Sequence, residues 1–266
     1  MLTCAEILRR LPGHPWASLV QVADCVDSTN TRLKAAALAG APEGTVLLAR
    51  HQTGGRGRMG RQFLSPEGAG LYLSVLLRPG AEPGELMHLT CAVAVAVCRA
   101  LEEACGLTAG IKWINDIVYD RRKLGGILTE LGFDRQGRVD WAVVGIGLNC
   151  SQGGSDFDPA IRDMAGSIAM ATGTAVDQNR LAAALIRHLE ILSWQMLTHR
   201  AEYLNEYRPR CVTLGKVVKV CRGETVTQGC ARDIDDQGAL LVDFGDGIPK
   251  PVSAGEVSVR GMYGYV

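Results

Sequence analysis

The stretch that decides how this chain is interpreted is GGRGRMGR at residues 54–61, followed by QFLSP at 62–66. Its glycines match the spacing of a dinucleotide-binding fingerprint, which also requires a helix to open at the last glycine. Residues 62–66 end in proline and predict no such helix. No GxxxxGK(S/T) run is present either, so the sequence predicts neither a Rossmann site nor a P-loop.

The composition of this loop still suits an anion. Arginines interleaved with glycines supply forked donors, and the missing Cβ atoms let the backbone approach a ligand closely. A phosphate-bearing ligand is one interpretation, and an ordinary solvated surface turn is the other. Lys plus Arg (28) balances Asp plus Glu (28) over the chain, so any basic site must be local.

Outward from the loop, the patterning predicts an α+β domain followed by an all-β one. β-rich runs are found at 19–26, 45–50, 71–77, 111–113, 117–119, 126–131 and 141–148, and helical patterns at 30–40, 86–104 and 180–198. A second helical stretch continues from there to residue 207, and Pro209 should close it. From residue 215 short alternating strands follow, at 217–221, 225–233, 239–244 and 257–260. We therefore predict a domain of residues 1–209 and a small β-barrel of residues 210–266.

Length and composition limit the class of protein. With 266 residues and 47% apolar content the chain can bury a full core. Charges interrupt the start of the chain, and no uninterrupted apolar run looks long enough to cross a bilayer, so we expect a cytoplasmic protein. The nine cysteines lack metal-ligand spacing, and those at 91, 98 and 105 are expected to pack in a helix core.

Three further strings accompany the Gly/Arg loop: KWIND at 112–116, KLGGILTE at 123–130 and GIGLN at 145–149. With DSTN at 27–30 and GEVSVR at 255–260, they resemble biotin protein ligases over nearly the whole chain. The resemblance implies a catalytic domain with a mixed, mainly antiparallel sheet flanked by helices, plus a small C-terminal SH3-like β-barrel. Ile114 departs from it, since the family usually has proline there.

The activity implied by the resemblance is that of an ATP-dependent biotin–[acetyl-CoA-carboxylase] ligase. The biotin carboxylate attacks the α-phosphate of ATP to give biotinyl-5'-AMP, and a lysine of a biotin carboxyl carrier protein domain then takes the biotinyl group. Mg²⁺ is expected with ATP, because phosphates usually supply most of its ligands. No carboxylate cluster in the sequence locates the metal.

By the same resemblance, one end of the site binds biotin. Ser28, Thr29 and Asn30 can donate to and accept from a ureido group, although a plain helix cap explains them equally well. Gln52 is a further biotin contact, with a solvated edge-strand position as its alternative.

The loop residues Arg56, Gly57 and Arg58 match the ligand-contacting stretch of the family. We expect this loop to act as a mobile lid that orders over the adenylate and shields it from water. Met59 and Phe63 are also placed where an adenine ring could pack, but they are not assigned to the site.

The resemblance assigns catalysis to Lys123, with Arg58. A lysine ammonium can offset charge where the carboxyl and the α-phosphate join, although a basic run at 121–123 is ordinarily a solvated turn. Asn115, Asp116 and Asn149 are expected near the nucleotide, and Asp116 could accept the proton of the incoming lysine. The alternatives are an ordinary Asn-Asp turn and a strand-end glycine pair beside Asn149.

Other functions stay open at this stage. A lipoate or octanoate ligase shares the fold and the chemistry, and a biotin-binding regulator or an inactive binding module would share the pocket. Some family members bind DNA through an amino-terminal helix-turn-helix. Only 26 residues precede Asp27 and the net charge is zero, so we expect no specific DNA binding. The sequence favours neither a monomer nor a homodimer.

Overall fold

The computed structural model describes residues 1–253 and 258–261, and within them seven strands form one sheet in the order β1-β2-β3-β7-β6-β5-β4. β1 pairs with β2 in parallel, and the other pairs are antiparallel. The strands are β1 (Val20–Val26), β2 (Val46–Gln52), β3 (Gly70–Leu77), β4 (Gly110–Lys112), β5 (Asp116–Tyr119), β6 (Arg122–Phe133) and β7 (Val139–Asn149). The prediction of a mixed, mainly antiparallel sheet is confirmed.

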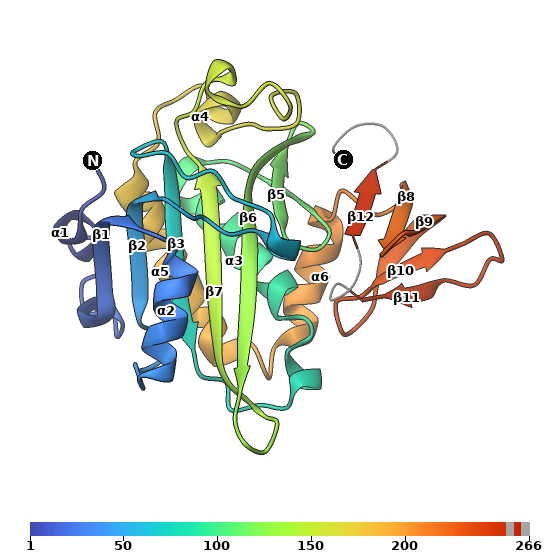
Figure 1. Cartoon of the computed structure of the whole chain (residues 1–266), viewed down its shortest axis with the longest axis horizontal. Helices are drawn as coiled ribbons and strands as arrows, with labels where there is room; N and C mark the ends of the chain where they lie inside the picture. Colours follow the sequence, from blue (N-terminus) through green and yellow to red (C-terminus); the bar gives the residue numbers. More distant parts are fainter. Residues whose placement is uncertain (254–257, 262–266) are drawn as a thin grey trace.

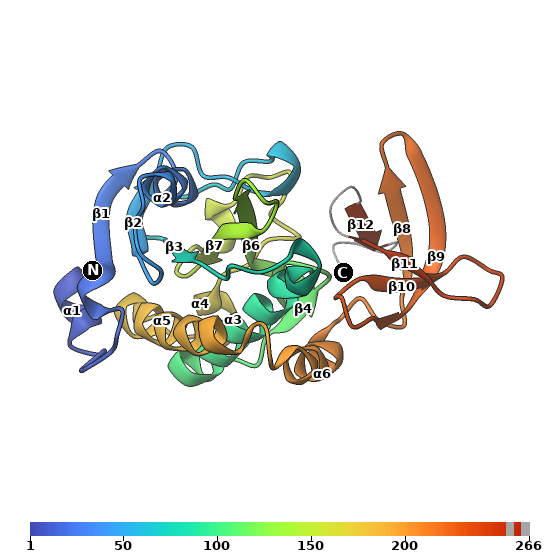
Figure 2. The same ribbon diagram turned by 90° about the horizontal axis from the view of Figure 1, so that it is seen from below.

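Helices cover both faces of this sheet (Figures 1 and 2), with α2 on one face and α3 and α5 on the other. The α-helices are α1 (Cys4–Leu8), α2 (Thr29–Leu38), α3 (Leu89–Cys105), α4 (Ile168–Thr172), α5 (Gln178–Gln195) and α6 (Arg200–Arg210). Short 3-10 turns are found at η1 (Ala17–Leu19), η2 (Arg58–Gly60), η3 (Pro83–Leu86) and η4 (Gly154–Asp156). The short helices α1 and α4 had no clear periodicity in the sequence.

The core lies between the sheet and the α3/α5 layer. α3 is rich in alanine and valine and is buried almost all round, because its small side chains let α5 and the sheet approach it closely. Cys91 and Cys98 are buried on it and Cys105 is half-buried, as predicted. The helix ends at Gly106, whose φ of 64° is left-handed and favours glycine.

The same helix corrects one expectation about membranes. Together with its preceding turn, the segment Pro83–Cys105 is long and apolar enough to cross a bilayer by length and composition alone. However, 72% of its most apolar window is buried inside the protein. Burial of that extent identifies it as the core helix of the domain.

A second, antiparallel sheet follows α6 and lies at the far end of the molecule from α1 (Figure 1). Its order within the described residues is β11-β10-β9-β8-β12, with β8 (Val217–Arg222), β9 (Thr225–Ile234), β10 (Leu240–Asp243), β11 (Lys250–Val252) and β12 (Ser258–Gly261). This confirms the predicted small C-terminal β-domain, although β11 was missed. Residues 255–257 of the GEVSVR string lie outside the described residues.

The junction between the two sheets has two features, of which the first differs from the prediction. α6 runs to Arg210 and carries Pro209 in its last turn, so the helix ends after the proline and not before it. The β9–β10 turn packs against the first domain, where the backbone carbonyl of Gly238 accepts a hydrogen bond of 3.0 Å from Trp113 Nε1. The second domain therefore contacts a residue that follows directly on β4.

Candidate active site

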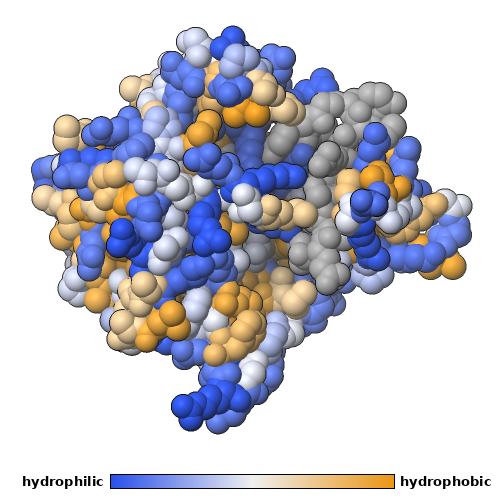
Figure 3. Space-filling model, in the orientation of Figure 1, coloured by the Kyte–Doolittle hydropathy of each residue, from blue (hydrophilic) through white to orange (hydrophobic). Residues whose placement is uncertain are grey.

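A pocket of about 470 Å³ opens between the sheet and the loop that joins β2 to β3. It lies on the face that carries α2, where hydrophilic side chains gather (Figure 3). The predicted site residues that line it are Ser28, Thr29, Asn30, Gln52, Arg56, Gly57, Arg58, Asn115, Asp116 and Lys123. Four segments far apart in sequence thus meet at one cavity, and of the predicted residues Asn149 alone lies outside its lining.

The start of α2 supplies a buried polar wall. Ser28 caps the helix, accepting a 3.5 Å hydrogen bond from Thr31 N, and it also lines the pocket. The N–H and hydroxyl of Thr29 both donate to Gln52 Oε1, at 2.9 and 3.1 Å. Cap and pocket wall are therefore not alternatives here.

Ser74 on β3, which was not predicted, supports this wall from outside the pocket lining. Its fully buried hydroxyl lies 2.7 Å from Thr29 Oγ1 and 2.6 Å from Asn30 Oδ1. A serine within an apolar run is typical of an ordinary strand residue, so the sequence did not indicate its place beside the pocket. Together these groups place several hydrogen-bonding atoms at one end of the cavity.

Two glycines of β7 let side chains of the site lie directly against the sheet. A Cβ on Gly145 would lie 2.1 Å from Asn30 Oδ1, and one on Gly147 would lie 2.7 Å from the Phe63 ring. Both residues line the pocket. The glycine pair that could have been a mere strand end is therefore the floor of the site.

The Gly/Arg loop folds back on itself over this floor. Gly57 N donates to Arg61 O at 2.7 Å, and Phe63 N donates to Gly55 O at 2.9 Å. Its tip is the single 3-10 turn η2, in which Met59 has a φ of 56°. No α-helix opens at Gly60, as predicted when the dinucleotide fingerprint was rejected.

Arg58 connects the loop to the β4–β5 turn. Its Nη1 donates to Asn115 Oδ1 at 3.0 Å. Burial lowers the pKa of Arg58, while the nearby Asp116 carboxylate acts in the opposite direction. Asn115 is itself tied to β6, because its Nδ2 donates to Ile127 O at 3.0 Å.

Lys123 lies in β6, and the preceding turn is made by Asp120 and Arg121, which have positive φ angles of 43° and 65°. Its Nζ donates to Asp116 Oδ1 at 2.6 Å, and its side chain is 31% exposed. The basic run 121–123 is thus divided between a turn and a pocket-lining strand position. The interpretation of Lys123 as part of a solvated turn does not describe this geometry.

Asn149 lies behind the pocket. Its Nδ2 donates to Gly166 O at 2.9 Å, and Gly166 N in turn donates to the backbone carbonyl of Lys123 at 2.9 Å. In this structure Asn149 therefore supports the backbone beside Lys123 and does not face the cavity.

The pocket is locally basic although the chain is neutral. Arg56, Arg58, Arg61, Lys112 and Lys123 line it, against Asp116 as the sole acidic residue of the lining described. No group of three His, Cys, Asp or Glu residues suited to a metal ion occurs in residues 1–253 and 258–261. The residues present fit an anionic ligand, and a magnesium ion would arrive with its phosphates rather than in a protein cage.

Trp113 is another lining residue that the sequence analysis left out. Its indole donates to Gly238 O, and its backbone N–H donates to Thr213 Oγ1 at 3.0 Å. The peptide bond between Trp113 and Ile114 is cis. A tryptophan in a β-rich run is more often core, so its place at the pocket could not be read from the sequence.

Comparisons with known proteins give a consistent result. Residues 22–149 match the model of the biotin/lipoate A/B protein ligase family, and residues 213–260 match the biotin protein ligase C-terminal domain. The chain is 37% identical over 251 residues to a biotin–[acetyl-CoA-carboxylase] ligase of Mycobacterium tuberculosis, covering 92% of this chain and 90% of that protein. It is also 34% identical over 232 residues to the bifunctional ligase/repressor BirA of Bacillus subtilis, covering 87% of this chain and 71% of that protein.

Among solved structures, a biotin protein ligase from Aquifex aeolicus in complex with biotin and ATP superposes with a TM-score of 0.78 at 30% identity. The match covers 91% of this chain and 98% of that one.

Proposed function

Since this chain belongs to the biotin protein ligase family, we propose that its pocket binds biotin and ATP and makes biotinyl-5'-AMP. The enzyme is then an ATP-dependent biotin–[acetyl-CoA-carboxylase] ligase. The observation that carries the proposal is the division of one cavity into a buried polar end and a strongly basic end. A volume of about 470 Å³ falls within the range of small-molecule sites, roughly 300–1,000 Å³.

The polar end suits the ureido group of biotin. Thr29, Asn30 and Ser28 present hydroxyl and amide oxygens, and Gln52 holds Thr29 in place. A lipoyl or octanoyl chain would leave these buried groups without new partners, which costs free energy. The geometry therefore favours biotin over the lipoate or octanoate alternative.

The basic end suits the first reaction step. A biotin carboxylate oxygen forms a bond to the α-phosphorus of ATP, and the bond to pyrophosphate breaks. Negative charge concentrates on the oxygens around the phosphorus, where Lys123, Arg58 and Arg56 supply fixed cations. A magnesium ion would enter with ATP, held by the phosphates, and would offset part of their negative charge.

In the second step a lysine amine of a biotin carboxyl carrier protein domain attacks the acyl carbon, and AMP leaves. The amine must lose a proton, and we assign its acceptance to Asp116, whose Oδ1 lies 2.6 Å from Lys123 Nζ. Asn115 is assigned to the nucleotide, through Arg58. Asn149 is assigned an indirect part, as a support for the Lys123 backbone.

The proposal extends to the domain boundary, the cellular location and the partners of the chain. We divide the chain at residues 209 and 210, beside the end of α6 at Arg210. We expect a cytoplasmic location, and the net charge of zero supports the expectation of no specific DNA binding. A biotin-dependent gel shift at physiological salt would contradict the latter, and sedimentation distinguishes monomer from homodimer.

Exchange of labelled pyrophosphate into ATP tests the function. We expect exchange that requires biotin and Mg²⁺ and that lipoate or octanoate does not support. Exchange with lipoate in place of biotin would overturn the substrate, and no exchange with either would overturn the ligase assignment. Transfer to a purified carrier domain, followed by mass, then tests the second step.

A further inference from the structure

Glu130 on β6 lies outside the pocket lining but contacts two residues that belong to it. Its Oε2 accepts a 2.9 Å hydrogen bond from Asn30 Nδ2. Its Oε1 accepts a 2.6 Å hydrogen bond from Lys34 Nζ and lies 3.6 Å from Arg56 Nη1. The carboxylate thus lies between α2 and the Gly/Arg loop.

This carboxylate is ionised at neutral pH. Burial raises the pKa of Glu130, but the hydrogen bonds from Lys34 and Asn30 outweigh burial and hold the pKa below its ordinary value. An ionised carboxylate accepts hydrogen bonds and cannot donate them. The group that Asn30 turns toward Glu130 must therefore be its amide nitrogen.

The rest of the Asn30 amide follows from this constraint. Its Nδ2 also donates to the Leu128 carbonyl at 3.2 Å, so both amide hydrogens are already used in hydrogen bonds within the protein. The Oδ1 atom accordingly points to Ser74 Oγ, 2.6 Å away, and lies against Gly145, which lines the pocket. Asn30 therefore presents an acceptor, and not a donor, at the polar end of the pocket.

We propose that Glu130 is a positioning residue that fixes the Asn30 amide with its oxygen toward the ligand, and so selects a ligand that presents an N–H there. This inference rests on the proposed function and deepens it, because a cyclic urea carries N–H groups on its ring. Glu130 acts through Asn30, and contact with the substrate is not part of its role.

Replacement of Glu130 by glutamine reverses this arrangement for a specific reason. A glutamine side chain has one oxygen, and this oxygen will accept the hydrogen bond from the Lys34 ammonium, which can only donate. The glutamine nitrogen then faces Asn30 Nδ2, donor against donor, and the Asn30 amide must rotate or move away. Arg56 Nη1 lies 3.6 Å from Oε1 and therefore interacts with this oxygen more weakly than Lys34 Nζ does at 2.6 Å.

The test measures the dissociation constant of biotin by titration calorimetry without ATP, for the wild type and three variants. We expect Glu130→Gln to weaken biotin about tenfold or more, the scale of one mismatched buried hydrogen bond. Lys34→Met should bind within about threefold of the wild type. The double variant Lys34→Met/Glu130→Gln should recover most of the affinity, because the glutamine can then turn its oxygen to Asn30.

Recovery in the double variant separates positioning from a structural role. A residue needed only for stability would make the double variant weaker than either single one. In steady-state assays, Glu130→Gln should raise the KM for biotin with little change in kcat. Glu206→Gln is the matched control, since this carboxylate also pairs with two cations, Arg99 and Arg210, but neither of them lines the pocket.

Two results overturn the inference: unchanged biotin affinity in Glu130→Gln, or a double variant as weak as Glu130→Gln alone. A wild-type protein that binds no biotin would contradict the proposed function itself. The two failures are therefore distinguishable.

Discussion

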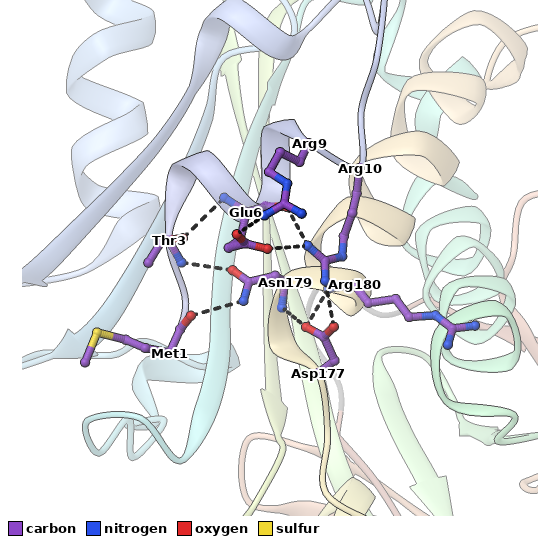
Figure 4. Close-up of polar contacts among 8 residues, drawn as sticks. All are labelled: Met1, Thr3, Glu6, Arg9, Arg10, Asp177, Asn179 and Arg180. Carbon is purple, nitrogen blue, oxygen red and sulfur yellow. Dashed lines mark hydrogen bonds and ion pairs between the residues drawn. The ribbon is translucent and has the colours of Figure 1, made fainter.

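Two helix N-termini in this protein carry similar polar residues but serve different ends. At α5, Asp177 Oδ1 accepts from the backbone N–H groups of Asn179 and Arg180, both at 3.0 Å, and Asp177 Oδ2 accepts from Arg10 at 3.0 Å (Figure 4). The Asn179 side chain accepts a 2.9 Å hydrogen bond from Thr3 N and donates one of 3.0 Å to Met1 O. This cluster joins the start of the chain to α5, and its polar atoms face one another.

At α2 the cap faces a cavity instead. Ser28 makes a long capping bond of 3.5 Å, and Thr29 and Asn30 line the pocket together with it. Glycine at 145 and 147 of β7, far along the chain, gives the Asn30 amide and the Phe63 ring room to lie against the sheet beside this cavity. A polar cap therefore becomes a binding site only where another element leaves space in front of it.

The largest effect should come from the cation in the cavity. We expect Lys123→Ala to slow adenylate formation by roughly 100-fold or more, the scale of removing one preorganised group at a charged transition state. Single-turnover formation of biotinyl-5'-AMP measures this, and circular dichroism should show the fold intact. Lys216→Ala, at an exposed position in the second domain, is the control. Adenylation at the wild-type rate in Lys123→Ala would remove Lys123 from the mechanism.

The floor of the cavity should give the next largest effect. A Cβ at residue 145 would meet Asn30 Oδ1 at 2.1 Å, so Gly145→Ala must displace the Asn30 amide. We expect biotin affinity to fall about 10- to 100-fold, the equivalent of ~1–3 kcal/mol for overpacking. Gly84→Ala is the matched control, because a Cβ there meets nothing within 4 Å. Equal affinities in the two variants would show that Asn30 is not at the ligand.

A third experiment compares the two regions by amide hydrogen exchange. If the Gly/Arg loop is a lid, exchange at residues 54–61 should slow several-fold when biotin binds. Residues 1–10, whose polar groups already face one another, should exchange equally with and without biotin. Equal exchange in the loop under both conditions would end the lid hypothesis without affecting the ligase assignment.

The smallest effect concerns stability alone. Asp177→Ala removes a helix cap and should lower the free energy of unfolding by ~0.5–2 kcal/mol, with pyrophosphate exchange unchanged. The partly exposed ion pair with Arg10 adds little to this. Urea denaturation measures the difference, and lost catalysis in this variant would contradict the separation of the two regions.

The same variant has a defined pH dependence. Burial raises the pKa of Asp177, but the Arg180 N–H, the Arg10 charge and the Asn179 N–H bring the pKa below its ordinary value of 3.8. A lowered carboxyl pKa stabilises the fold above about 3.8, and this contribution is lost as the pH falls through the lower folded value. The difference between wild type and Asp177→Ala should therefore be constant near pH 7 and shrink below pH ~3.8.

The sequence predicted most of the sheet and the long helices because their apolar runs are bounded by clear turn residues. It also located the Gly/Arg loop and Lys123, through local strings. Ser74, Trp113 and Glu130 were not predicted as site residues, since a serine, a tryptophan or a glutamate in a β-rich run does not indicate which residues face it in the fold. Asn149 is the opposite case: its string was distinctive, but its amide donates to Gly166 O and the residue lies outside the pocket lining.

The Phe63 ring occupies the space above Gly147 and meets the Tyr72 ring edge to face, with centroids 6.4 Å apart. The loop therefore packs on the sheet only because residue 147 of β7 is a glycine, which leaves room for the Phe63 ring. A side chain at position 147 would displace the Phe63 ring and move the loop segment that carries it away from the sheet. We therefore expect positions 63 and 147 to covary in evolution. Related sequences with a larger residue at 147 should carry a smaller one at 63.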